Sequence, residues 1–142
     1  MYNARALLKD TLRSHGLSLT EARLSVFKIL LGYGPLNMVS LLNKTSGRAD
    51  RASVYRAAAT FEKIGIAQRV SVGMDEKLEL TEIFEGHHHH FSCTNCGRII
   101  SINDRQLESY IDNLPSLRGN QIVAHQLDIQ GLCSKCLSIS QT

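Results

Sequence analysis

The sequence lacks any long apolar run. In its 142 residues, no stretch approaches the roughly 18 consecutive apolar residues that suggest a membrane-spanning helix. The first ten residues, MYNARALLKD, contain no apolar core of a secretory signal peptide. These absences argue against a membrane protein, and we expect a cytoplasmic one. Because thiols stay reduced there, the four cysteines are more often metal ligands or redox switches than structural disulfides.

The sequence also lacks a strong excess of one charge sign and recognisable motifs for enzymatic chemistry. The formal net charge is +3, which permits nucleic-acid binding without requiring it. With 43% hydrophobic and 20% charged residues, the chain is globular rather than disordered. No HExxH or nucleophile motif is present, so we predict that the protein is not an enzyme. A zinc-dependent hydrolase, with Glu82 or Glu108 as the base beside the histidines, is the rival from that class.

The first half of the sequence predicts helices followed by a β-hairpin. Apolar periodicity predicts helices over about 4–15, 21–31, 36–43 and 51–64, with Thr20 capping the second. Asp50 or Ser53 caps the fourth. The predicted buried faces are Leu24, Phe27 and Leu31 on the second helix, and Val54, Ala57, Ala58 and Phe61 on the fourth. Alternating apolar residues over 70–80, around a turn at Gly73, predict a β-hairpin. The last three of these helices, followed by the hairpin, have the layout of a winged helix.

The second half predicts a small α/β domain, so the overall class is α+β. A strand is expected over 98–102, and then a helix capped by Asn103 or Asp104 with Leu107, Tyr110, Ile111 and Leu114 on one face. Residues 121–130 alternate, which predicts a strand that carries Val123, His125, Leu127 and Ile129 on one face. We place the winged helix at 1–82, a hinge at 83–86 and the second domain at 87–142.

The four cysteines form two CxxC pairs, and the members are Cys93, Cys96, Cys133 and Cys136. A CxxC turn points both sulfurs at one place, and two such turns supply the four thiolates of a closed structural zinc site. Gly97 suits the tight turn after the first pair. A pair of redox disulfides is the other interpretation.

Four consecutive histidines precede the first cysteine pair. In an extended segment, alternate side chains point to opposite faces, so His87 and His89 form one pair and His88 and His90 another. Imidazole suits zinc, iron, nickel and copper, but each pair needs further ligands. His125, on an apolar strand face, and Glu108, beside an apolar helix face, are candidates for one pair. Glu79 and Glu82 are candidates for the other pair, with ordinary surface charge, or a solvated histidine-rich loop, as the competing interpretation.

The fourth predicted helix also has an exposed face suited to DNA. Arg56 and Lys63 share it with two alanines, and small residues beside basic ones let a helix approach base edges and phosphates. Tyr55 lies at the edge of this face, and Ser53 lies at the start of the helix. Arg23 and Arg69 are candidates for contacts with the backbone or minor groove. Plain surface charge is the competing interpretation for the basic residues.

From about Leu17 to Cys136 the chain resembles the ferric uptake regulator (Fur) family of bacterial metal sensors. The resemblance rests on the order and spacing of LTEARLSVFKIL, ASVYRAAATFEKIGIAQRV, LELT, GHHHHFSCTNCGRIISI and AHQLDIQGLCSKC. It implies a DNA-binding winged helix and a C-terminal dimerisation domain, with a structural Zn²⁺ on the four cysteines. It also implies a dimerisation-domain metal site at His87, His89, Glu108 and His125, where the family often has Asp in place of His89.

The resemblance further implies a sensing site at the hinge. His88 and His90 match it, together with Glu82, or with Glu79 if LELT sets the register. Many members add a histidine where this chain has GPLNMVS, and some use an acidic residue where it has Ser101. The run with Gly86 resembles the zinc-sensing (Zur-like) branch.

The resemblance thus implies a homodimeric, metal-dependent repressor that binds double-stranded operator DNA and controls iron or zinc uptake genes. The regulatory metal would be Zn²⁺ or Fe²⁺, with Mn²⁺ as a further candidate. A peroxide- or redox-responsive regulator of the same family is the alternative.

Overall fold

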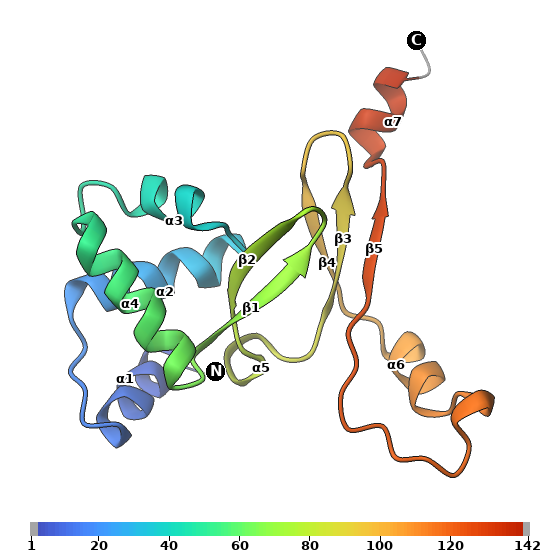
Figure 1. Ribbon diagram of the computed structural model, residues 1–142, viewed down its shortest axis with the longest axis horizontal. Coiled ribbons are helices and arrows are strands. Elements are labelled where there is room, and N and C mark those ends of the chain that lie inside the picture. Colours follow the sequence, from blue (N-terminus) through green and yellow to red (C-terminus); the bar gives the residue numbers. More distant parts are fainter. Residues whose placement is uncertain (1–2, 141–142) are drawn as a thin grey trace. The chain divides into compact units, whose positions relative to one another are not determined.

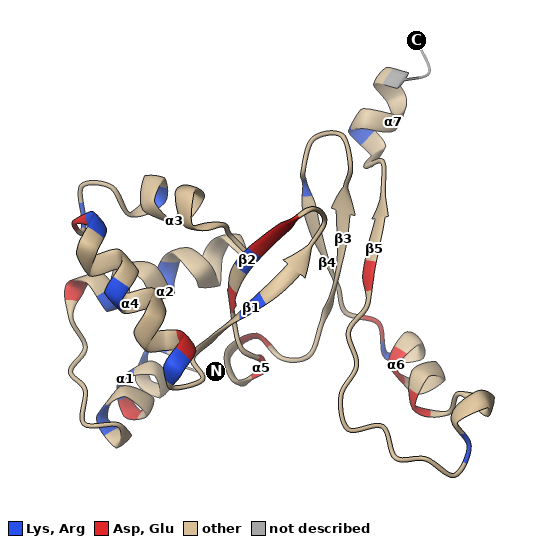
Figure 2. Cartoon of the chain, viewed as in Figure 1, with Lys and Arg blue, Asp and Glu red and all other residues tan. Residues whose placement is uncertain are grey.

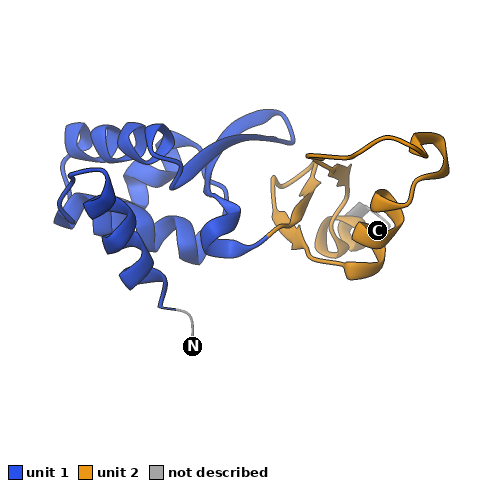
Figure 3. Cartoon of the chain, turned by 90° about the horizontal axis from the view of Figure 1, so that it is seen from below, with its two compact units in different colours: residues 1–86 blue, residues 87–142 orange. Residues whose placement is uncertain are grey.

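The computed structural model describes residues 3–140 and divides the chain into two compact units, Met1–Gly86 and His87–Thr142 (Figure 3). Within residues 3–140, no helix is both long and apolar enough to cross a membrane. The first unit is mostly helical and the second is built on a small sheet (Figure 1). The α+β class predicted from the sequence is confirmed.

The first unit has the predicted winged-helix layout. Its elements are α1 (Ala4–Ser14), α2 (Glu21–Tyr33), α3 (Met38–Thr45), α4 (Arg51–Lys63), β1 (Ala67–Val72), β2 (Asp75–Leu80) and α5 (Glu82–Glu85). Thr20 caps α2 by accepting a hydrogen bond from the amide of Arg23, as predicted. Asp50, rather than Ser53, caps α4.

The core of the first unit lies between α2 and the elements around it. The buried stripe predicted for α4, from Val54 to Phe61, is confirmed. The stripe predicted for α2 is wrong at Leu31, which is 40% exposed, whereas Leu30 is fully buried. Because α2 packs against α3, α4 and β2, it is covered on several sides, and a single-face periodicity describes it poorly.

The wing is an antiparallel hairpin. β1 and β2 pair from Ala67 opposite Leu80 to Val72 opposite Asp75, and the turn between them contains Gly73 at φ 68°. The short helix α5 follows β2. Its Phe84 ring meets the ring of Phe27 edge-on at a centroid distance of 5.1 Å, which attaches α5 to the helical core.

The second unit is built on a three-stranded sheet. Its elements are β3 (His89–Cys93), β4 (Ile99–Ile102), α6 (Arg105–Asp112), a 3₁₀ turn (Pro115–Leu117), β5 (Asp128–Gly131) and α7 (Ser134–Ser140). The strand order is β4-β3-β5, with β4 antiparallel and β5 parallel to the central β3. Of the two caps predicted for α6, Asn103 and Asp104, the structure has Asp104, whose carboxylate accepts hydrogen bonds from two amides of the first turn.

Two predictions about this unit need correction. The strand expected over 121–130 is only β5, and residues 121–127 form no strand. Pairing with β3 starts at His90 opposite Asp128, and the amide just before it, that of Leu127, donates to the ring of His89 instead of to a strand. The apolar face predicted for α6 is incomplete, because Tyr110 is 65% exposed.

Candidate metal centres and nucleic-acid interface

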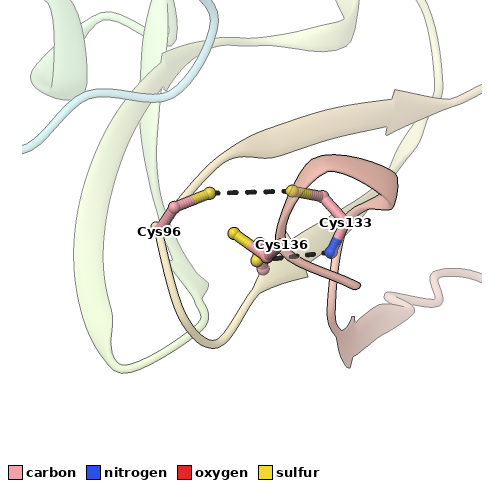
Figure 4. A group of neighbouring side chains, drawn as sticks. Cys96, Cys133 and Cys136 are labelled. Atoms are coloured by element: carbon pink, nitrogen blue, oxygen red, sulfur yellow. Dashed lines mark hydrogen bonds between the residues drawn. The ribbon is translucent and has the colours of Figure 1, made fainter. Parts of the chain in front are cut away.

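The four cysteines come together at one end of the sheet of the second unit. Their sulfur atoms all lie within 4.8 Å of one another. Cys93 ends β3, Cys96 lies in the following turn, and Cys133 and Cys136 lie at the start of α7. The Sγ atoms of Cys96 and Cys133 are 3.8 Å apart (Figure 4). Because zinc–sulfur bonds of 2.3 Å place tetrahedral sulfurs about 3.8 Å apart, this group fits Zn²⁺.

Hydrogen bonds around the sulfurs make the four thiols unequal. Backbone amides, first that of Cys96 and then that of Cys133, lower the pKa of Cys93 to about 6. The Asn95 side chain donates to Sγ of Cys136 over 3.3 Å and lowers the pKa of that thiol. The neighbouring sulfurs and burial outweigh Asn95 and raise the pKa of Cys136 to about 11. Without a cation, therefore, the four groups do not all ionise near neutral pH.

A second group in the same unit combines three imidazoles with one carboxylate. Glu108 on α6 faces the Nε2 atoms of three histidines, with Oε1 2.8 Å from His89 and Oε2 2.9 Å from His125 and 3.4 Å from His87. The Nε2 atoms of His87 and His125 are 3.0 Å apart. Metal–ligand bonds of 2.0–2.1 Å place tetrahedral ligand atoms about 3.3 Å apart, so this group also fits a divalent metal.

The charges of this group favour a cation. Burial lowers the pKa of His89, although the hydrogen bond with Glu108 acts against it, so the ring is neutral near pH 7. Burial raises the pKa of Glu108, but the hydrogen bond with His89 and the nearby histidines outweigh burial and lower that pKa overall. An ionised carboxylate thus lies beside the neutral imidazole of His89 and two further imidazoles, and these are the ligand types that zinc accepts.

The hydrogen-bond network also assigns the tautomer of His89. The amide of Leu127 donates to Nδ1 over 3.2 Å, so Nδ1 is an acceptor. The proton of the neutral ring is then on Nε2, directed at Oε1 of Glu108.

The alternation predicted for the histidine run is confirmed. The rings of His87 and His89 lie 4.8 Å apart, and those of His88 and His90 lie 4.9 Å apart. The residues predicted for the hinge site are divided between the units. In the first unit, Glu79 on β2 is buried and accepts from the Gln68 side chain over 3.1 Å, whereas Glu82 at the start of α5 is exposed.

The exposed face of α4 carries a chain of polar contacts. The side chain of Arg56 donates to the Ser53 hydroxyl over 3.2 Å, and this hydroxyl donates to the Asp50 carboxylate over 2.7 Å. The same hydroxyl contact lowers the pKa of Asp50. Tyr55 is 47% exposed beside them, and Lys63 is exposed at the end of the helix. The guanidinium of Arg56 is therefore oriented before any partner arrives.

The other predicted DNA-contact residues differ in their surroundings. Arg23 on α2 donates to the carbonyl of Ser18. Arg69 on β1 forms ion pairs with Glu62 on α4 and with Glu76 on β2, so it links the wing to α4. Arg48, which was not among the predicted contacts, is an exposed residue between α3 and α4 and lies two residues before the cap of α4. Blue segments on α1 to α4 and on β1 and β2 mark basic residues of this unit (Figure 2).

Comparison with known proteins identifies the family of this chain. Residues 14–130 match the Ferric uptake regulator family. The Ferric uptake regulation protein of Neisseria meningitidis is 28% identical over 141 residues, which cover 95% of this chain and 94% of the relative.

Solved structures show the same fold. The Vibrio cholerae ferric uptake regulator has a TM-score of 0.70 at 25% identity, covering 88% of this chain and 98% of that one. The Helicobacter pylori ferric uptake regulator has a TM-score of 0.73 at 20% identity, covering 94% and 91%. The match spans most of the chain and includes both units, and the chain belongs to the ferric uptake regulator family.

Proposed function

We propose that this protein is a homodimeric, metal-dependent repressor that binds operator DNA and controls iron or zinc uptake genes. One observation carries the proposal most directly. A winged-helix unit with an oriented Arg56 is joined in one chain to a unit in which Glu108 faces three imidazoles. The regulators from Neisseria meningitidis, Vibrio cholerae and Helicobacter pylori support it, since the last is described as having three functional metal binding sites.

In this proposal Cys93, Cys96, Cys133 and Cys136 hold a structural Zn²⁺. The ion would supply the positive charge that lets all four thiols ionise together. The chain's own contribution is to bring the turn after β3 and the start of α7 to one place. Asn95 donates to a sulfur of the group and orients that thiolate.

Regulation would come from the histidine run. His87, His89, Glu108 and His125 form the dimerisation-domain site. His88 and His90, with Glu79 or Glu82, form the sensing site beside the hinge at 83–86. Metal affinity that differs between two arrangements of the winged helices would shift the population toward the arrangement that binds DNA. Zn²⁺, Fe²⁺ and Mn²⁺ are all compatible with these ligands.

DNA reading is assigned to α4. Arg56 presents a fork suited to guanine, and Tyr55 lies beside it. Ser53 positions Arg56, and Arg23, Lys63 and Arg69 are the remaining predicted contacts. Arg56→Ala is expected to abolish operator binding while the dimer persists by sedimentation. An unchanged gel shift would contradict this assignment.

The deciding experiment is operator binding by the dimer after removal of regulatory metal, with the cysteine-bound zinc retained. The dimer is titrated with Zn²⁺, Fe²⁺ and Mn²⁺ at buffered free concentrations. We expect affinity for the operator to rise with one or more of them. Equal affinity with and without metal would refute a metal sensor.

A redox-responsive regulator is the second candidate. It is favoured by Cys93, whose pKa of about 6 leaves much of that sulfur as thiolate at neutral pH, and by the exposure of the neighbouring Cys96. Operator binding that survives mild peroxide treatment would separate the metal sensor from this candidate.

A further inference from the structure

A cavity of about 450 Å³ lies in the first unit, between the first turns of α2 and α4. Its lining includes three arginines from three separate segments. Arg23 comes from α2, Arg48 from the turn between α3 and α4, and Arg56 from α4. Guanidinium groups repel one another, so three around one cavity indicate a site for an anion.

The three arginines differ in how they are held. Arg23 donates to the carbonyl of Ser18, and Arg56 donates to the hydroxyl of Ser53. The side chain of Arg48 makes no hydrogen bond or ion pair with the part of the chain that the structure describes, residues 3–140. Two of the three are therefore fixed at the cavity wall, while Arg48 keeps all its donors for a ligand.

The net charge of the lining limits which anion fits. Two carboxylates, those of Glu21 and Asp50, also line the cavity. Asp50 already accepts from the amide and the hydroxyl of Ser53, so part of its hydrogen-bonding capacity is taken. Three guanidinium groups against two carboxylates leave a charge of +1. This matches a phosphodiester, which carries a single negative charge, better than a doubly charged free phosphate.

The position of the cavity identifies the source of that phosphodiester. Arg56 and Ser53 belong both to this lining and to the face of α4 that we assign to base reading. A base pair in the groove and the phosphate of a flanking nucleotide lie side by side on one duplex. The partial positive charges at the first turns of α2 and α4 add to the attraction.

We propose that this cavity binds one backbone phosphate of the operator and that Arg48 is a phosphate-contact residue. The proposal rests on the DNA-binding function proposed above. It assigns Arg48 to affinity rather than to sequence reading, because phosphate contacts position a protein on DNA and base contacts specify the sequence. Arg48 thereby differs from Arg56.

The test measures the dissociation constant of the metal-loaded dimer for an operator duplex and a scrambled duplex over a series of salt concentrations. Each lost phosphate contact lowers the slope of log K against log salt by about 0.9, so Arg48→Ala lowers it by about 1.8 for a dimer. Affinity for the two duplexes falls by the same factor, so their ratio is unchanged. Arg48→Lys retains the charge and most of the slope.

Lys28→Ala is the matched control. Lys28 is also exposed and carries the same charge in the same unit, but it does not line the cavity, so its slope stays near that of the wild type. An unchanged slope in Arg48→Ala, or a loss confined to the operator duplex, would overturn the proposal. So would calorimetric binding of inorganic phosphate that Arg48→Ala abolishes with the DNA slope unaltered. Failure of the wild type to bind any duplex would refute the proposed function itself.

Discussion

The attachment of α5 to the helical core can be tested by a single substitution, Phe84→Ala. Phe84 is 8% exposed and meets Phe27 edge-on at 5.1 Å, whereas its neighbour Ile83 is 60% exposed. Removing a buried phenylalanine side chain costs about 3–5 kcal/mol of unfolding free energy. The low end, about 3 kcal/mol, is expected here, because α5 has four residues and can settle into part of the space.

The effect on melting follows from the size of the unit. The first unit has 86 residues, and in a domain of this size each kcal/mol lowers the melting temperature by about 4–8 °C. Phe84→Ala should therefore melt about 12–24 °C below the wild type. Circular dichroism at the helical wavelength reports mainly on this unit, since it contains the three longest helices of the described residues, α1, α2 and α4.

Two further variants make the test specific. Phe84→Leu retains most of the buried volume and loses the ring pair, so about 1 kcal/mol is expected. Ile83→Ala should change the melting temperature little. Because α5 directly precedes the histidine run, Phe84→Ala should also weaken the metal-dependent gain in operator affinity at a temperature where it is still folded. Equal melting of Phe84→Ala and Ile83→Ala would refute the packing argument.

Three other predictions concern the second unit. Removal of the Zn²⁺ that we propose for the four cysteines should leave residues 87–140 open to amide hydrogen exchange while α1 to α4 stay protected. The reason is that the buried cluster described for this unit consists of three of the cysteines, with Phe91 packed against them. Persistent protection after verified zinc loss would contradict this. Asn95→Ala should weaken zinc retention against a chelator by about 10–100-fold, because it removes the hydrogen bond to Cys136. Thr94→Ala is the neighbouring control. Equal zinc retention in the two variants would exclude a role for the Asn95 hydrogen bond. In metal-stripped protein the pKa values of His89 and Glu108 in the folded state lie below their ordinary values of 6.5 and 4.5. The unfolded chain therefore binds more protons than the folded chain at these groups. The unfolding free energy of the second unit should then fall as the pH drops below about 6.5 and again below about 4.5. Glu108→Gln should remove the lower step, and stability that rises on acidification would show the sign to be wrong.

Local patterns predicted the helices of the first unit well because a helix cap and a periodic buried stripe are both encoded within the helix itself. The caps Thr20 and Asp50 and the buried stripe of α4 follow from helix periodicity and from the preference of such residues for helix starts. Leu31 was misplaced because burial on α2 depends on α3, α4 and β2 together, and no local pattern contains that information.

The second unit shows more clearly what a local sequence pattern cannot predict. Alternation over 121–130 predicted a strand, but a strand also needs a partner, and pairing with β3 starts only at Asp128. The grouping of His87, His89, Glu108 and His125 was predicted from side-chain direction and from the family resemblance. The tautomer of His89 and the Asn95 contact with Cys136 depend on residues about 40 positions apart, and spacing alone does not predict them.

The hydrogen bond from the Leu127 amide to His89 links metal occupancy of the His89 site to the backbone of the second unit. A neutral imidazole that gives Nε2 to a metal carries its proton on Nδ1, where the Leu127 N–H already points. Two donors cannot share that contact, so His89 can become a ligand only if the Leu127 amide turns away. The carbonyl of Leu127 accepts from the amide of His90, and β5 begins at the next residue. Loading of the site would therefore be coupled to the backbone at the start of β5, and the exchange rate of one amide proton, that of Leu127, would record whether the site is filled.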